Sequence, residues 1–406
     1  MRLIQSGNLQ LDSKIVSLLP QHVVSILETP CTKELLSQVT IRHLMSHTSG
    51  LSVGGLPGYT GQEIPDIETV LSGKAPANTL QVRMAGLPGF MFSYSGGGMI
   101  VLQVVLETIT GKDFPSVVKE LVLEPLKMSR SFYDLPGKEK NVAKAHFTGY
   151  TPCDVAWHTL PEKGAAGLWT TPTDLLKVVR AMQSSLKGGT EKEFLETEIA
   201  RQMLQEVQNT MALSWVAPTD PGIAFGHGGS NFPGWECFVM GYADLKNSGK
   251  QQVWDGCGVS IMTNSAAGFT VWAKVFHAIA CLKGWAPLPY FDGRGAFGKI
   301  PFCVYGAKVT ERWAEWKGSW RDGEKALVLE SGDDREPTLR FGDIGGVRLV
   351  PAAIPCIDYK GKGGSIDLVL EGLEMMLRLG WKDDEKGIEL WFDGTPPRVV
   401  DLTRCE

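Results

Sequence analysis

The sequence predicts a mixed α/β (α+β) domain, with an antiparallel sheet flanked by helices, followed by a smaller all-β domain. Residues 1–305 alternate between helical and strand-like hydrophobic patterns. From Trp313 onward, short strand-like runs recur at intervals of roughly 8–12 residues, which is typical of a small barrel or sandwich. Residues 287–301 are rich in proline and glycine, as linkers are. We therefore expect one domain at 1–305 and a second at 306–406.

Two helices of the first domain have clear boundary signals. After the glycine run at 96–98, apolar residues recur at helical spacing from Met99 and stop at Gly111. Thr171 is a favourable N-cap, and Pro172 suits the first turn of a helix because that turn has no use for its missing N–H. The sequence therefore predicts a buried helix before Gly111 and an amphipathic helix after Thr171.

The strands are predicted from runs of β-branched and aromatic residues between turn signals. In the first domain we expect neighbouring antiparallel strands, and residues 271–282 return to helical spacing and should cover that sheet. The expected strands of the first domain are 212–217, 236–244 and 252–263. Those of the second domain are 326–330, 338–341, 347–350, 365–370, 375–379, 388–392 and 399–402.

Composition excludes several classes of protein. The formal net charge of -5 gives no basic surface for nucleic acid, so we expect no nucleic-acid partner. The apolar run at 99–106 falls short of the ~20 residues that cross a bilayer. The N-terminus has no signal-peptide pattern, which favours a cytoplasmic protein without a membrane span. Oligomeric state stays open.

Metal and cofactor sites are not indicated by the cysteine and histidine spacing. The 8 cysteines include no Cys-x-x-Cys pair. Two pairs spaced i, i+4, His43 with His47 and His277 with Cys281, have no further ligands nearby. The glycine-rich run at 293–298 is followed by Ile300 and Pro301 where a nucleotide-binding loop would open a helix. We therefore expect neither metal nor cofactor.

Four segments resemble signature segments of one family, and they occur in the same order. They are residues 40–51 (TIRHLMSHTSGL), 88–114 (PGFMFSYSGGGMIVLQVVLETITGKDF), 165–182 (AAGLWTTPTDLLKVVRAM) and 225–235 (FGHGGSNFPGW). Together they resemble the serine β-lactamase and penicillin-binding-protein family, including its class C-related, peptidase S12-like hydrolases and acyltransferases. This resemblance implies a β-lactamase/transpeptidase-like fold for the first domain. Some members also carry a lipocalin-like C-terminal domain, which the second domain resembles.

The resemblance also implies an acyl-transfer site. Tyr94 matches the tyrosine of the family's second motif, in which it acts as general base or proton shuttle, although Gly96 replaces the usual asparagine. His227 matches the third motif, in which it stabilises charge or holds a carboxylate. A half-buried core tyrosine and an ordinary hydrogen-bonded histidine are the alternatives. The expected substrate-binding residues are Gly228, Gly229, Asn231 and Trp235.

The family's nucleophile motif, Ser-x-x-Lys, is not found where the resemblance requires it. Residues 1–20 already resemble the segment that follows the nucleophile helix. The two Ser-x-x-Lys strings that do occur, at Ser116 and Ser184, lie at other places in the family pattern, and we expect neither to be the nucleophile. Ser52 lies in a Gly-x-Ser-x-Gly string, but the glycines and proline that follow forbid the helix of a nucleophile elbow.

Two functions are therefore compatible with the sequence. The first is a serine hydrolase or acyltransferase that acts on an ester, amide or thioester of a small-molecule acyl substrate through an acyl-enzyme. The relatives that this resemblance implies include esterases, D-amino-acid peptidases and an acyltransferase of secondary metabolism. The second is a non-catalytic remnant of the fold that binds a small molecule or a protein partner. An in-frame Ser-x-x-Lys upstream of Met1 would favour the first.

Overall fold

The computed structural model divides into two compact units, Met1–Trp272 and Ala273–Glu406, which are described separately below. The expected domain boundary at residue 305 and the linker at 287–301 fall outside the described residues, so the boundary stays a prediction. The structure describes residues 1–60, 63–133, 137, 139–146, 152–155, 157–188, 193–217, 224–231, 233–243, 255–283, 285, 311–323, 325–332, 336–341, 344–351, 366–370, 375–382, 385–392 and 398–405.

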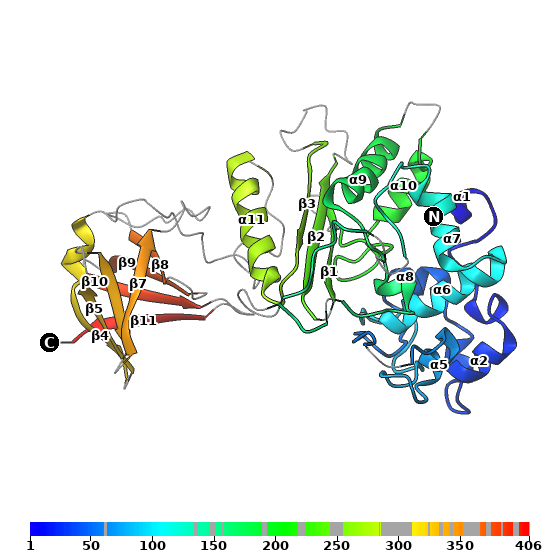
Figure 1. Ribbon diagram of the computed structural model, residues 1–406, viewed down its shortest axis with the longest axis horizontal. Coiled ribbons are helices and arrows are strands. Elements are labelled where there is room, and N and C mark those ends of the chain that lie inside the picture. Colours follow the sequence, from blue (N-terminus) through cyan, green and yellow to red (C-terminus); the bar gives the residue numbers. More distant parts are fainter. Residues whose placement is uncertain are drawn as a thin grey trace. The chain divides into compact units, whose positions relative to one another are not determined.

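The first unit consists of two long helices, α6 (Gly96–Thr110) and α9 (Pro172–Lys187), several shorter helices and a sheet (Figure 1). Across the described ranges, no helix is both long enough and apolar enough to cross a membrane. The helical elements before the sheet are α1 (Arg2–Gln5), η1 (Ile15–Ser17), α2 (Gln21–Leu27), α3 (Lys33–Leu36), α4 (Ile41–Met45), α5 (Ile67–Ser72), α6 (Gly96–Thr110), α7 (Phe114–Val118), η2 (Lys119–Leu123), α8 (Lys163–Ala166), α9 (Pro172–Lys187) and α10 (Thr197–Leu204).

Helix α6 confirms the prediction for residues 99–111 and forms the centre of the largest apolar cluster. Its first turn is capped because Ser95 Oγ accepts a hydrogen bond from the N–H of Gly98 at 2.8 Å. Its last turn ends at Gly111, whose φ of 66° is a conformation that suits glycine. Between these caps, Val101 and Val105 are fully buried. The caps fix both ends of the helix, and burial on most of its faces holds it in the core.

The sheet of the first unit has three antiparallel strands in the order β1-β2-β3: β1 (Ala224–Asn231), β2 (Trp235–Tyr242) and β3 (Gly258–Thr263). Figure 1 shows α9 lying along one face of this sheet. As predicted, α9 begins after Thr171, whose side chain caps it, with Pro172 in the first turn. Val179 of α9 packs in one apolar cluster with Phe225 of β1 and Val239 of β2.

The expected strand at 212–217 is wrong. The segment contains bends, and within it Val216 alone bridges to the sheet, at Gly226. Ser214 has a φ of 64°, which breaks the extended conformation that a strand needs. The other two expected strands are present as β2 and β3, although β3 begins only at Gly258. The predicted helix at 271–282 corresponds to α11 (Gly268–Lys283), and its Trp272 stacks on Phe238 of β2 with ring centroids 4.4 Å apart.

The second unit contains a closed eight-stranded antiparallel barrel, which confirms the all-β prediction. Sequential strands pair with one another and β11 closes on β4, the up-and-down arrangement found in lipocalins. All seven expected strands are present, and β4 was not predicted. The elements are η3 (Glu311–Trp316), β4 (Gly318–Asp322), β5 (Lys325–Ser331), β6 (Pro337–Phe341), β7 (Ile344–Pro351), β8 (Ile366–Leu370), β9 (Met375–Lys382), β10 (Glu385–Phe392) and β11 (Arg398–Arg404).

Large apolar side chains form the core of this barrel. Trp316 and Trp320 are buried together with leucines from most of the strands. Trp320 Nε1 donates a hydrogen bond to the carbonyl of Trp316 at 2.8 Å, which satisfies a polar atom that would otherwise be buried without a partner.

Candidate active site

Tyr94 lies in the loop that leads directly into α6, and the buried Ser95 fixes this loop. Ser95 Oγ accepts from Gly98 N–H in the first turn of α6 and donates to the carbonyl of Ser52 at 3.0 Å. Ser95 is almost fully buried, while Tyr94 is 48% exposed. Tyr94 is therefore held at a well-fixed point of the backbone, with its ring partly open to solvent.

The ring of His47 stacks on the ring of Tyr94. Sequence reasoning did not identify His47 as a site residue. The two rings are stacked with centroids 4.1 Å apart, and Phe92 meets His47 edge-on at 6.3 Å. His47 has a φ of 54° and is 2% exposed. Its Nδ1 accepts a hydrogen bond from the N–H of Ser95 at 3.2 Å, so the ring proton of neutral His47 resides on Nε2.

His47 is a neutral ring at neutral pH. Burial and, to a smaller extent, the nearby His227 lower the pKa of His47 to about 4. His43, the other member of the i, i+4 pair, uses Nδ1 to accept a hydrogen bond from Thr40 N–H, which closes the cap of α4. No group of three or more potential metal ligands is found within the described ranges, and the side chains of the pair at 277 and 281 lie outside them.

The structure brings His227 to Tyr94, although 133 positions separate them in the sequence. Their ring centroids are 6.3 Å apart at an interplanar angle of 42°. His227 is on β1, half-buried, and its Nδ1 donates to the carbonyl of Gly228. Burial lowers the pKa of His227. As a neutral ring, His227 presents Nε2 as a hydrogen-bond acceptor and would hold a carboxylate less strongly than a charged imidazolium would.

Burial raises the pKa of Tyr94, and no neighbouring charge opposes this effect in the described part of the chain. At neutral pH Tyr94 is therefore a neutral phenol, whose hydroxyl is able to donate a hydrogen bond. A tyrosine acts as a base only when a cation favours its phenolate. The described residues thus place a neutral donor, Tyr94, beside a neutral acceptor, His227.

Among the strands that the structure describes, β1 lies at one edge of the sheet, and His227 of this pair belongs to it. Gly226 exchanges two backbone hydrogen bonds with Val216 on that side, at 2.9 and 3.0 Å. Backbone groups of alternate residues point to the same side of an antiparallel strand. Gly228 and Ser230 therefore direct their N–H and carbonyl groups toward the same edge, where a substrate carbonyl could approach.

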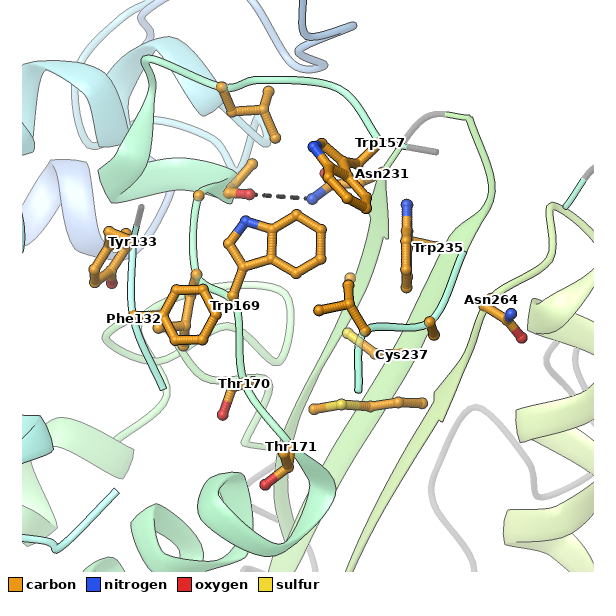
Figure 2. Close-up of a pocket in the computed structure, with 18 of the residues that line it drawn as sticks. Phe132, Tyr133, Trp157, Trp169, Thr170, Thr171, Asn231, Trp235, Cys237 and Asn264 are labelled. Atoms are coloured by element: carbon orange, nitrogen blue, oxygen red, sulfur yellow. Dashed lines mark hydrogen bonds between the residues drawn. The ribbon is translucent and has the colours of Figure 1, made fainter. Parts of the chain in front are cut away.

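The other expected binding residues line a neighbouring cavity of about 640 Å³. Gly229, Asn231 and Trp235 all border it. Figure 2 shows Asn231 and Trp235 there, and Asn231 Nδ2 donates to the carbonyl of Ala166 at 3.1 Å. Gly229 leaves room for Cys237, because a Cβ at this glycine would lie 2.8 Å from Cys237 Sγ. Gly228 does not line this cavity.

The serines that belong to misplaced motifs lie elsewhere. Ser116 is exposed on α7, and its Oγ donates to Asp113 Oδ2 at 2.9 Å. Ser184 is exposed on α9. Ser52 Oγ accepts from Arg83 N–H and donates to the carbonyl of residue 81 in a loop, not at a strand–helix elbow. None of the three lines the cavity.

The fold and the arrangement around Tyr94 define a β-lactamase-like protein. The chain belongs to the Beta-lactamase family, whose model matches residues 1–282. It is similar to penicillin-binding protein 4 of Amycolatopsis lactamdurans, with 26% identity over 294 residues, which cover 69% of this chain and 72% of the relative.

Two solved structures resemble the whole chain in fold. The octameric penicillin-binding protein homologue from Pyrococcus abyssi matches with a TM-score of 0.57 and 18% identity, covering 99% of this chain and 84% of its own. The structure of SurE matches with a TM-score of 0.50 and 18% identity, covering 100% of this chain and 84% of its own. At these identities the likeness concerns the fold.

Proposed function

We propose that this chain carries the acyl-transfer site of a serine hydrolase or acyltransferase that acts on an ester, amide or thioester. The observation that carries the proposal is the contact between Tyr94 and His227 beside the open edge of β1. Family membership supports the class of reaction. The open edge at Gly228 provides backbone donors of the kind that stabilise an oxyanion.

In this proposal the acyl transfer involves a serine nucleophile, a proton carrier and a hydrogen-bond acceptor for the substrate. A serine hydroxyl attacks the acyl carbonyl and forms the acyl-enzyme ester, while its proton passes to a base and then to the leaving group. Water or an acceptor alcohol then attacks the ester and releases the serine with a proton returned to it. In this scheme Tyr94 would carry that proton, and His227 would accept a hydrogen bond from the substrate. The serine and the lysine that activates Tyr94 would come from a Ser-x-x-Lys segment upstream of Met1 in the gene.

The test compares the 406-residue chain with a protein extended upstream through an in-frame Ser-x-x-Lys. With p-nitrophenyl acetate, we expect background hydrolysis by the former and turnover by the latter. In the extended protein, Tyr94→Phe should lower kcat/KM by about 10²–10⁴-fold, as is usual for loss of a general base. Ser116→Ala and Ser184→Ala are the matched controls and should change nothing. Fast hydrolysis by the 406-residue chain that depends on Tyr94 would contradict this division of roles.

A second candidate function is binding without catalysis. The raised pKa of Tyr94 favours it, because a neutral phenol without a cation is a poor base. The cavity of about 640 Å³ needs no nucleophile to hold a ligand. This candidate becomes the better one if the gene has no Ser-x-x-Lys upstream and the purified chain does not hydrolyse activated esters.

A further inference from the structure

The cavity next to Tyr94 and His227 lies on the same face of the sheet as His227. Gly229 faces Cys237 across the β1–β2 ladder, Cys237 faces Met262 across the β2–β3 ladder, and all three line the cavity. Gly229 follows His227 by two residues, so their side-chain positions share one face, with Cα atoms about 7 Å apart along the strand. The cavity therefore begins immediately beyond the proposed reaction site.

Helix α9 covers the opposite end of this face and leaves the cavity open. A Cβ at Gly241 would lie 2.5 Å from Cγ1 of Val179, and one at Gly258 would lie 3.0 Å from the same atom. The helix begins at Pro172, and Thr171 and Pro172 border the cavity. The beginning of α9 thus sets the boundary between the packed and the open part of the sheet face.

Aromatic side chains from separate segments form the wall of this cavity (Figure 2). Trp169 lies between Trp157 and Trp235, with ring centroids 5.7 Å from each and interplanar angles of 84° and 78°. Phe132 and Tyr133 extend the wall. All five are half-buried, and none belongs to the apolar clusters of the core. Aromatic surface that is gathered in a concave site without being buried is typical of a ligand pocket.

The groups along the aromatic part of the wall are mostly neutral, and the charged side chains that border the cavity elsewhere are Arg130, Glu139, Lys163 and Glu236. Burial raises the pKa of the Cys237 thiol to about 11 and raises that of Tyr133. At the rim, Arg130 pairs with Glu139, the nitrogen and oxygen being 3.3 Å apart. Burying a ligand charge against such a wall is costly without a partner.

The three tryptophans meet edge to face, so that Trp157 and Trp235 are both nearly perpendicular to Trp169. Such a wall offers both ring faces and ring edges, on which a flat aromatic ring packs offset-stacked or edge to face. A cation over a ring face is the alternative ligand, and a cationic comparison compound distinguishes the two.

We propose that the cavity binds a bulky, uncharged aromatic or fused-ring group, seated against Trp157, Trp169 and Trp235. Its volume falls within the range of roughly 300–1,000 Å³ that is usual for drug-sized ligands. It is far larger than an acetyl group or a single small acyl chain requires. That this ring belongs to the acyl substrate rests on the proposed function, whereas the binding itself does not.

The direct test is calorimetric titration of the 406-residue chain with 2-naphthamide, a neutral ring compound that cannot be turned over as an ester. Acetamide and phenyltrimethylammonium are the small and the cationic comparison ligands. We expect 2-naphthamide to bind at least about tenfold more tightly than either, a difference of about 1.4 kcal/mol. Equal binding of all three ligands, or tighter binding of the cation, would overturn the proposal.

Substitutions in the cavity wall test whether 2-naphthamide binds in this cavity. Trp169→Leu should weaken 2-naphthamide binding by about tenfold, since aromatic pairs contribute up to ~1.5 kcal/mol beyond their buried area. Trp285→Leu is the matched control, because Trp285 is also half-buried but does not line the cavity, and it should leave binding unchanged. If Trp169→Leu fails to fold by circular dichroism, Trp157→Leu takes its place. Unchanged binding in the folded variant would exclude this cavity as the site.

The two proposals fail in different ways. If 2-naphthamide binds and the extended protein hydrolyses no ester, the proposed function is wrong and the binding site stands. If the extended protein hydrolyses p-nitrophenyl acetate while 2-naphthamide does not bind, the inference about the cavity is wrong. If both hold, Trp169→Leu should lower kcat/KM for p-nitrophenyl 2-naphthoate and not for p-nitrophenyl acetate.

Discussion

Acidification should destabilise the protein through His47. In the folded state the pKa of His47 is lowered from 6.5 to about 4, because the ring is buried and His227 is near. The folded state therefore binds this proton less readily than the unfolded chain does. The contribution of His47 to stability is complete above pH 6.5 and is lost as the pH falls toward 4. The difference of about 2.5 between the two pKa values corresponds to about 3 kcal/mol, at ~1.36 kcal/mol per unit.

His47→Asn separates this effect from the other titrating groups. Asparagine tolerates the positive φ of 54° at this position and does not titrate in this range. Urea unfolding at about pH 7.5, 6 and 4.5 gives the free energy of unfolding at each pH. We expect the wild type to lose a few kcal/mol more than His47→Asn over this range, because most of the effect described above falls within it.

The matched control is His22→Asn. His22 is exposed on α2, where it contacts Glu68, so this change should leave the pH dependence close to that of the wild type. The lowered pKa of His227 acts in the wild type and in both variants, and it largely cancels in the comparison. If the wild type and His47→Asn lost equal amounts of unfolding free energy between pH 7.5 and 4.5, the conclusion that His47 is a buried neutral ring would be refuted.

Two further changes test the packing of the first unit. Neither carboxylate oxygen of the fully buried Glu162 has a hydrogen-bond partner among the described residues, and burial raises its pKa. Glu162→Gln should therefore raise the melting temperature at pH 7–8. The gain should vanish near pH 4, where the wild-type carboxyl is protonated and as neutral as the glutamine amide. An unchanged melting temperature at pH 8 would contradict this. Gly241→Ala should lower the free energy of urea unfolding by about 1–3 kcal/mol, because its Cβ would meet Val179. The control is Gly228→Ala, whose Cβ would come no closer than 3.7 Å to the residues around it and which should cost less than about 1 kcal/mol. Equal losses of stability in the two variants would show that α9 can move aside.

The sequence predicted the elements whose signals are local. Helix α6 has its cap at Ser95 and its stop at Gly111, and α9 has its cap at Thr171, so their ends are determined by neighbouring residues. The strands of the barrel were found because short strand-like runs are separated by turn residues at regular intervals. The segment 212–217 has strand-like composition, but the positive φ at Ser214 and the contacts around it prevent a strand.

The candidate site was predictable only where a motif names the residue. Tyr94 and His227 were found through the resemblance, and their catalytic roles remain to be tested. His47 lies within one of the quoted segments, but nothing local reveals that it stacks on Tyr94, since that contact depends on a loop 47 positions later in the chain. The wall formed by Trp157, Trp169 and Trp235 likewise depends on three segments that meet only in the fold.

The neutral state of His47, Tyr94 and His227 has a consequence for how the site responds to salt. Three adjoining rings that could each carry a charge carry none at pH 7, since burial lowers the pKa of both histidines and raises that of the tyrosine. These rings therefore exert no long-range electrostatic attraction on a charged ligand, and dissolved salt has no such interaction with the rings to screen. Capture of a neutral ligand should proceed at nearly the same rate from dilute buffer to physiological ionic strength.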